Sequence, residues 1–294
     1  MMVFAGKGKE DKEKKITFFS KEAVRCPVCG AAFHREELFS GRVNAGDLTD
    51  ELHRKYIPMR DFGEVQPLAY DVTVCPSCFF AALRSDFSSV PQKALEVLER
   101  ETSTRIAQVQ KVFEGLDFQG ARGILEGAAS YYLAALCYEH FPKDFSPTLK
   151  GAMCCLRAAW LCGYLHEKAP NENYDYLARV FYRKARVLYR GAIDREQTGK
   201  EPIGGARWMG PDTDKNYGYE GVLYLAGVLE LKYGNREDPA YREKILDESK
   251  RTIAKMFGLG KRSKAKPGPL LDKARDLYER IKAELHQDDD SDDE

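Results

Sequence analysis

The fold is decided by two short stretches of sequence, Arg25-Cys26-Pro27-Val28-Cys29-Gly30 and Val74-Cys75-Pro76-Ser77-Cys78-Phe79. In each stretch two residues separate the cysteines, so one tight turn presents both sulfur atoms to the same metal ion. Two such turns supply four thiolates in a tetrahedron, with each sulfur about 2.3 Å from zinc. The pattern therefore predicts one structural zinc ion (Zn²⁺) held by Cys26, Cys29, Cys75 and Cys78.

The two motifs differ in the residue that follows the second cysteine. Gly30 permits the left-handed backbone that such a turn favours, whereas Phe79 is expected to strain it. The 45 residues between the motifs exceed the spacing of about 15–20 in the compact pattern. An elaborated zinc ribbon tolerates this insertion, because the entropy cost of closing a loop grows slowly with its length.

Other interpretations of these residues remain open. Each pair of cysteines could be a redox dithiol, although a thioredoxin-type motif should open a helix after a strand. A rubredoxin-like iron site uses the same four thiolates. His34 or His53 could replace a cysteine as ligand, but four thiolates already complete the site, so both histidines are expected at the surface. Four cysteines leave no open position, which favours a structural over a catalytic metal.

The region around the motifs, residues 16–88, has the texture of strands and loops. Segments 16–19, 31–39 and 68–74 have β-type composition, and the last alternates apolar residues. Gly, Pro, Asn and Asp punctuate residues 41–67, which predicts an irregular connection. We therefore predict a small zinc-ribbon-like β module.

The rest of the chain is predicted to be helical. Ser146-Pro147 and Asp238-Pro239 each place a capping side chain before a proline at the first helical position. A polar helix is expected at about 89–113, and six further helices at about 121–140, 147–168, 173–196, 216–233, 239–257 and 269–286. Such stacked helical hairpins favour a TPR-like array, although no clean 34-residue period is present. The remaining cysteines are expected to pack in its core: Cys137, Cys154, Cys155 and Cys162.

Several longer segments resemble a bacterial family classed as a domain of unknown function. They are RCPVCGAAFHREELFSGR (25–42), YIPMRDFGEVQPLAYDVTVCPSCFFAALRSDF (56–87), AALCYEHF (134–141) and CCLRAAWLCGYL (154–165). The resemblance covers about 16–258 and implies paired CPxC knuckles, with the four cysteines as metal ligands, followed by TPR-like helices. The family pattern also includes, with no implied role, Arg42, Asp61, Tyr70, Asp86 and the Ala159-Trp160 pair. Phe79 departs from the family's usual glycine.

The sequence thus predicts an α+β chain with four parts. These are a disordered tail (1–15), the zinc-ribbon-like module (16–88), a larger all-α TPR-like helical-hairpin domain (89–287) and an acidic disordered tail (288–294). No run of about 20 apolar residues suggests a membrane span, and the first residues lack a signal-peptide core, so a cytoplasmic location is expected.

Composition and motifs weigh against several classes of function. Lys plus Arg and Asp plus Glu both number 46, so the basic excess of a nucleic-acid binder is missing, and the basic residues Lys261, Arg262, Lys264 and Lys266 are interpreted as solvated. No P-loop, nucleophile elbow or HExxH motif points to an enzyme. We therefore predict a non-enzymatic scaffold or adaptor for an unidentified protein or peptide. A zinc/thiol redox-sensing switch and nucleic-acid binding through the zinc ribbon remain as alternatives.

One long connection between helices is a candidate contact surface for that partner. It runs from about residue 197 to residue 215 and contains Arg207 and Trp208. Trp and Arg are favoured at binding hot spots. The alternative is that Trp208 packs back on the helices.

Overall fold

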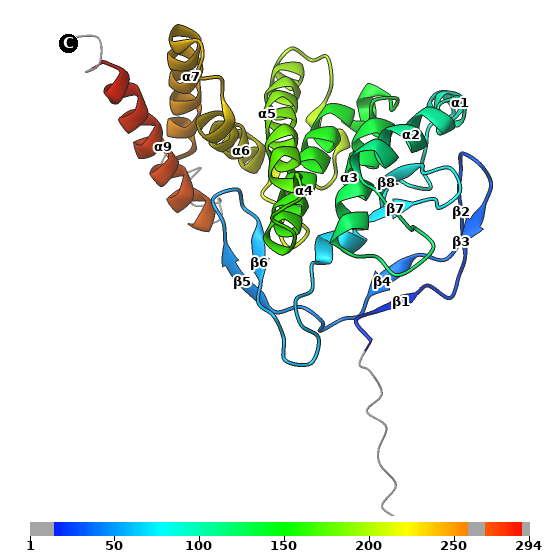
Figure 1. Cartoon of the computed structure of the whole chain (residues 1–294). Coiled ribbons are helices and arrows are strands. Elements are labelled where there is room, and N and C mark those ends of the chain that lie inside the picture. The colour runs from blue at the N-terminus through cyan, green and yellow to red at the C-terminus, as the bar shows by residue number, and fades with distance from the viewer. Residues whose placement is uncertain (1–14, 258–267, 290–294) are drawn as a thin grey trace, which may run out of the picture.

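A computed structural model describes residues 15–257 and 268–289 of the chain (Figure 1). The four basic residues at 261–266 and most of the two predicted tails lie outside these ranges. Within them, small antiparallel ribbons are followed by a mostly helical region, as the α+β prediction requires. No helix of the described ranges is both long and apolar enough to cross a membrane.

The N-terminal region consists of two-stranded antiparallel ribbons rather than one sheet. They pair β1 (Thr17–Phe19) with β4 (Glu36–Leu38), β2 (Val24–Arg25) with β3 (Ala32–Phe33), β5 (Ala45–Leu48) with β6 (Arg54–Tyr56), and β7 (Val72–Val74) with β8 (Ala81–Leu83). The two cysteine motifs form the turns of the second and fourth ribbons. Each turn therefore sits at the end of a short ribbon.

Two predictions for this region are wrong in part. The segment 68–74 is not one strand, because its first half forms a 3-10 helix, η1 (Pro67–Tyr70), and only the second half is β7. Proline fixes φ near the helical value, and Leu68 and Ala69 are buried in the core. The supposed irregular connection, 41–67, contains the β5–β6 hairpin. Its strands are polar and carry a glycine, so the sequence gives them no strand signal.

The helical region closely follows the predicted pattern. Its helices are α1 (Gln92–Arg100), α2 (Thr102–Val112), α3 (Ile124–Tyr138), α4 (Pro147–Lys168), α5 (Tyr174–Gln197), α6 (Gly218–Tyr233), α7 (Pro239–Phe257) and α9 (Gly268–Asp289). The predicted helix 89–113 is broken at Glu101, because side chains of Arg105 and Thr102 donate to the carbonyl oxygen of Leu98. These bonds occupy the oxygen that would accept the next helical bond.

The two proline-marked helix starts behave differently. At α7 the Asp238 carboxylate accepts a hydrogen bond from the amide of Tyr241, at 3.0 Å, which confirms the predicted cap. At α4, Ser146 has a left-handed backbone, and its hydroxyl bonds to the carbonyl oxygen of Pro202 instead of to the helix. Glu201 from the long connection accepts the amide of Thr148 at 2.7 Å and so serves the first turn of α4.

Helix α4 is the centre of the core and packs against α3 and α5. The four cysteines predicted to lie in the helical core are all buried. The buried apolar cluster also includes Val74, Phe80 and Phe87, so it crosses the domain boundary predicted near residue 88. A buried ion pair between Lys150 and Asp86, 2.6 Å apart, joins α4 to the end of the β7–β8 region.

We predict opposite effects for two helical glycines replaced by alanine. In Gly127→Ala the new Cβ would lie 2.8 Å from the Cα of Ala69. Such overpacking should lower the free energy of unfolding by about 1–3 kcal/mol. In Gly163→Ala nothing lies within 4 Å of the new Cβ, so helix propensity alone should raise it by up to about 1 kcal/mol. Urea unfolding measures both variants, and a Gly127→Ala protein as stable as the wild type would contradict the packing of α3 on η1.

Candidate metal centre

Each cysteine motif folds into the same kind of turn. The amide of Cys26 donates to the carbonyl of Ala31 at 2.8 Å, and the amide of Cys75 donates to that of Phe80 at 2.9 Å. Inside each turn, the residue after the second cysteine donates back to the carbonyl of the first cysteine at 2.9 Å. The two turns therefore present their sulfur atoms in the same way.

The strained position predicted in the second turn is present. Gly30 has φ +74° and Phe79 has φ +54°, so a phenylalanine occupies the left-handed region where glycine is the usual residue. Its ring packs edge-on against Phe118, with centroids 5.1 Å apart. This contact helps to hold Phe79 in a conformation that the backbone alone disfavours.

The four predicted ligands come together at one point. Their sulfur atoms all lie within 4.8 Å of one another, with Cys26 to Cys78 at 3.7 Å and Cys29 to Cys75 at 3.6 Å. A tetrahedron with metal–sulfur distances of about 2.3 Å has edges of about 3.8 Å. The group can thus hold a metal ion, and it is the one such group of His, Cys, Asp and Glu found in the described ranges, without His34 or His53.

Mutual hydrogen bonds shift the pKa values of three of these cysteines in different directions. Hydrogen bonds from Cys26 and Cys78 lower the pKa of Cys75 to about 2. The bond to Cys75 raises the pKa of Cys26 to about 12, and bonds to Cys26 and Cys75 raise the pKa of Cys78. The Cys75 thiol therefore gives up its proton most readily, and the deprotonated form of cysteine is the one that binds metals.

Buried contacts tie the centre to the helices. Arg105 of α2 donates to the carbonyl oxygen of Cys78 at 2.7 Å and to that of Leu98 at 2.9 Å. Cys26, Cys75 and Cys78 are buried, whereas Cys29 is exposed. The group therefore combines three buried cysteines with one exposed cysteine.

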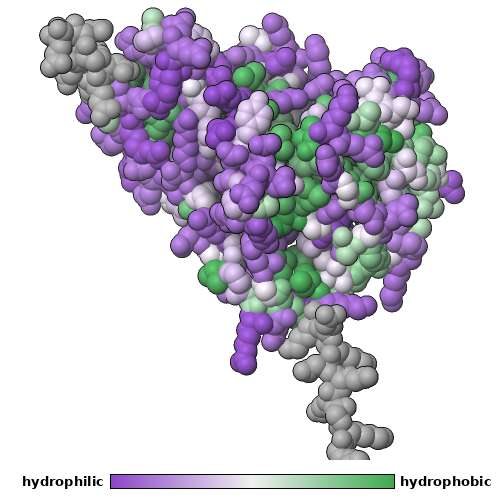
Figure 2. All heavy atoms as spheres, in the orientation of Figure 1, coloured by the Kyte–Doolittle hydropathy of each residue, from purple (hydrophilic) through white to green (hydrophobic). Residues whose placement is uncertain are grey.

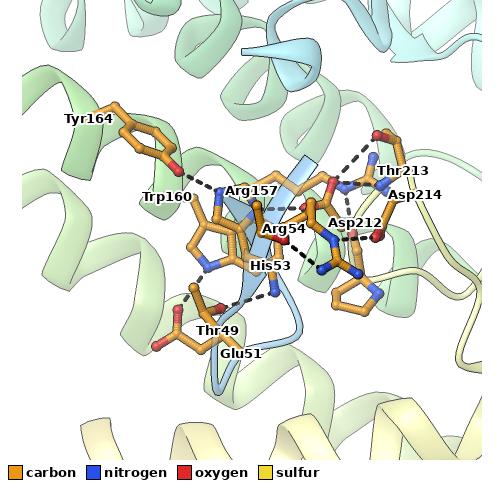
Figure 3. A network of polar contacts seen from close by, with 12 residues as sticks. Thr49, Glu51, His53, Arg54, Arg157, Trp160, Tyr164, Asp212, Thr213 and Asp214 are labelled. Carbon is orange, nitrogen blue, oxygen red and sulfur yellow. Dashed lines mark hydrogen bonds and ion pairs between the residues drawn. The ribbon is translucent and has the colours of Figure 1, made fainter. Parts of the chain in front are cut away.

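His34 is exposed as expected, but the prediction for His53 is wrong. Only 4% of His53 is exposed, and its ring stacks on Trp160 with centroids 4.3 Å apart (Figure 3). Its Nδ1 lies 2.6 Å from Asp212, and its Nε2 lies 2.9 Å from the hydroxyl of Tyr164. Both ring nitrogens thus have partners. These partners are distant from His53 in the sequence, so the sequence alone could not identify them.

His53 belongs to the tip of the β5–β6 hairpin, which is buried against the helices. Glu51 accepts hydrogen bonds from Trp160 of α4 at 2.8 Å and Tyr182 of α5 at 3.0 Å, and it pairs with Lys232 of α6 at 2.9 Å. The next residue, Leu52, is fully buried and has φ +58°. The tip therefore joins three helices through one buried carboxylate.

The neighbouring Asp50 extends this attachment to the last helix. Its carboxylate lies 2.9 Å from the guanidinium of Arg280 in α9, and its carbonyl accepts from the hydroxyl of Tyr224 in α6 at 2.9 Å. Arg280, Lys232 and Lys273 together keep the pKa of Asp50 below its usual value, although burial acts to raise it. The hairpin and four helices therefore form one packed unit.

The predicted contact residues lie in the connection that also supplies Asp212. Arg207 and Trp208 are exposed, Trp208 to 40%, and neither belongs to the group that could hold a metal. The indole of Trp208 donates to the carbonyl of Asp212 at 2.8 Å. The ring is therefore both partly packed and partly open, and its role stays a prediction.

The comparisons with known proteins identify relatives without a described activity. A family described as uncharacterised proteins conserved in bacteria (DUF2225) matches residues 19–281. A protein of Borreliella burgdorferi (strain ATCC 35210 / DSM 4680 / CIP 102532 / B31), itself described as uncharacterised, is 44% identical over 275 residues. The alignment covers 92% of this chain and 98% of that protein. No solved structure matches the chain.

We predict that Asp212→Asn lowers the free energy of unfolding above pH 4. The variant should also lose less of that free energy than the wild type when the pH falls below 4. Burial raises the pKa of Asp212, but bonds from His53, Arg54 and Thr213 outweigh it and leave the pKa below its usual value. A depressed pKa contributes stability above the unfolded value of about 4, and this stability is lost as pH falls through the folded value. At pH 7 the variant should lose about 1–3 kcal/mol, because buried donors lose a charged acceptor.

The matched control for this prediction is Asp214→Asn. Asp214 lies in the same connection and pairs with Arg54 at 3.0 Å, but both side chains are partly open to solvent. A pair of this kind contributes about 0–1 kcal/mol. Urea unfolding from pH 3 to pH 7 measures the free energy of unfolding of both variants. If both lost the same amount, the buried Asp212–His53 contact would contribute no more to stability than the partly exposed Asp214–Arg54 pair.

Proposed function

The chain belongs to DUF2225, a family of uncharacterised proteins conserved in bacteria, and we propose that it is a non-enzymatic interaction scaffold built around a structural zinc ion. The observation that carries the proposal is the convergence of four cysteine sulfur atoms within 4.8 Å. Four thiolates complete the tetrahedral shell of zinc and leave no position for water or substrate. The metal would therefore stabilise the fold rather than perform a reaction.

The polar groups of the interior support a structural role. His53 uses both ring nitrogens, Glu51 is bound by three helices, and the Asp86 carboxylate is shared by Tyr138 and Lys150. An acid or base needs a substrate within hydrogen-bond reach. These groups already have their hydrogen-bond partners within the protein, so we interpret them as structural. A rigid fold of this kind is suited to binding another molecule.

A zinc/thiol redox switch is the second candidate, because Cys29 is exposed while the other three cysteines are buried. An oxidant such as hydrogen peroxide could reach that sulfur first, and a disulfide formed there would release the metal. Zinc release by equimolar peroxide within minutes favours the switch. Zinc retained under a large excess favours the structural role.

We predict that the protein purified without chelator carries about one zinc ion per chain. Cys26→Ser and Cys75→Ser should each weaken zinc binding by at least about 100-fold, because losing a ligand should exceed the 10–100-fold effect of an outer-shell change. Cys162→Ala removes a buried thiol outside the centre and should keep the wild-type metal content. Elemental analysis and competition with a chromogenic chelator give the measurement.

The same samples decide between metals and test the site itself. A rubredoxin-like iron site would colour the protein, whereas zinc is colourless. Denaturation of the zinc form should release one metal ion and make all eight thiols reactive, four from the centre and four from the helical core. Full zinc content in either cysteine variant would show that the four sulfur atoms are not the ligands.

A further inference from the structure

Strand β1 has a free edge. The backbone N–H of Ser20 donates to the carbonyl of Arg35, and the N–H of Phe39 donates to the carbonyl of Ile16. In this antiparallel pairing every second residue of the strand, beginning with Ile16, faces β4. By this alternation the N–H and C=O groups of Thr17 and Phe19 point away from β4. In the described part of the chain no backbone hydrogen bond of Thr17 or Phe19 uses these groups, and β4 is the strand that pairs with β1.

A cleft of about 710 Å³ runs beside this strand. Residues 15–19 form one wall, and Phe62, Tyr70 and Arg122 lie among those that form the rest. The cleft combines aromatic side chains with a few polar groups, which is the usual composition of a ligand site.

The polar groups of the cleft are held in place before any ligand arrives. Glu36 accepts from the hydroxyl of Thr17 at 2.5 Å and from the amide of Arg122 at 2.7 Å. The guanidinium of Arg122 donates to the carbonyl of Val72 at 2.6 Å. These bonds fix the β1–β4 ribbon against the body of the protein, so the free edge is presented rigidly.

Exposed aromatic residues surround the edge. Phe18 and Phe19 are 37% and 46% exposed, and the ring of Phe18 lies 4.6 Å from that of Phe39. The guanidinium of Arg42 lies over Phe62 at 4.2 Å. Figure 2 shows hydrophobic residues among hydrophilic ones on the lower part of the face in view. Apolar surface beside an open strand edge is suited to a partner strand.

The charges of the cleft suggest which side chains it accepts. Lys15 and Arg122 are cationic and Glu36 and Asp61 are anionic, so the formal charges cancel. A balanced lining gives no preference for a strongly charged ligand. An uncharged segment with large apolar side chains at alternate positions fits both the edge and the surrounding aromatic rings.

We infer that β1 binds an extended, apolar peptide segment of a partner protein, which adds to the β1–β4 ribbon as a third strand. The backbone of the peptide bonds to Thr17 and Phe19, and one of its side chains enters the cleft. The inference rests on the proposed interaction function and names its binding surface. The tip of the β5–β6 hairpin already occupies one side of α4, α5, α6 and α9, so a partner cannot use that side without displacing the hairpin.

The test uses the zinc-loaded full chain and a phage-displayed library of random dodecapeptides. The tightest selected peptide is synthesised, and its Kd is measured on the wild type, Phe19→Pro and Phe19→Val. Proline removes the outward N–H of residue 19 but spares the bonds to β4, whereas valine keeps that N–H. Both variants lose the aromatic ring, and only proline also loses the N–H, so we expect Phe19→Pro to bind the peptide at least about tenfold more weakly than Phe19→Val.

A second measurement needs no protein variant and so stands even if Phe19→Pro misfolds. The peptide is N-methylated at one residue at a time. Methylation should abolish binding at alternate residues, whose N–H groups face β1, and should be tolerated between them. Equal sensitivity at every position, or tight binding to Phe19→Pro, would overturn the inference while leaving an interaction function in place. A library that yields no binder would also overturn the inference, whereas the prediction of one zinc ion per chain is tested separately and would be unaffected.

Two other occupants of the edge are distinguished by hydrogen exchange of the Phe19 amide without peptide. Fast exchange is expected for an open edge. Slow exchange at every protein concentration would mean that residues 1–14 of the same chain already cover it. Slow exchange that appears only at high concentration would mean that a second copy does, and either result would overturn the inference.

Discussion

Four cysteine sulfur atoms can lie within 4.8 Å of one another only if protons or a cation hold them together. The ribbons that carry them need this link. β2 and β3 are two residues long, and β7 and β8 are three, while an isolated two-stranded ribbon is marginal in water. The ribbon β7–β8 packs on α3, and β2–β3 reaches the apolar core through the side chains of Val24 and Phe33. The sulfur cluster adds a second link, which joins the turn of β2–β3 to the turn of β7–β8.

A second constraint joins the rest of the N-terminal region to the helices. Glu51 at the tip of β5–β6 is buried, and an unpaired charge there would cost several kcal/mol of folding free energy. Three helices supply its partners Trp160, Tyr182 and Lys232, and Arg280 of a fourth helix pairs with the partly exposed Asp50. The tip can be buried only when those helices are in place, and its contacts in turn hold the helices together. In agreement with this, the apolar cluster includes Leu52 of the tip and extends across the domain boundary predicted near residue 88.

The features that could be predicted from the sequence are local turns and helix starts, which depend on residues close together in the chain. The cysteine pairs were found because a spacing of two residues already determines a turn, and α4 and α7 were found because a proline marks each start. What depends on distant partners was missed. His53 was expected at the surface, yet its partners Tyr164 and Asp212 lie more than 100 residues away. Trp160 stood in the family pattern without a role, and only the folded chain shows it against His53 and Glu51.

The first cysteine turn and the free strand edge lie on one long hairpin made of two ribbons. β2–β3 is nested between β1 and β4 in the sequence, so the cysteine turn is the far end of a hairpin whose base is the β1–β4 pair. The registers of the two pairs differ by two residues, and the irregular middle is bridged by Ser20, which bonds to Arg35 and His34. The base has its own anchor, because Glu36 binds the amide of Arg122. The tip is thus held where Cys26 and Cys29 meet Cys75 and Cys78, while the anchor at Glu36 keeps the β1 edge formed.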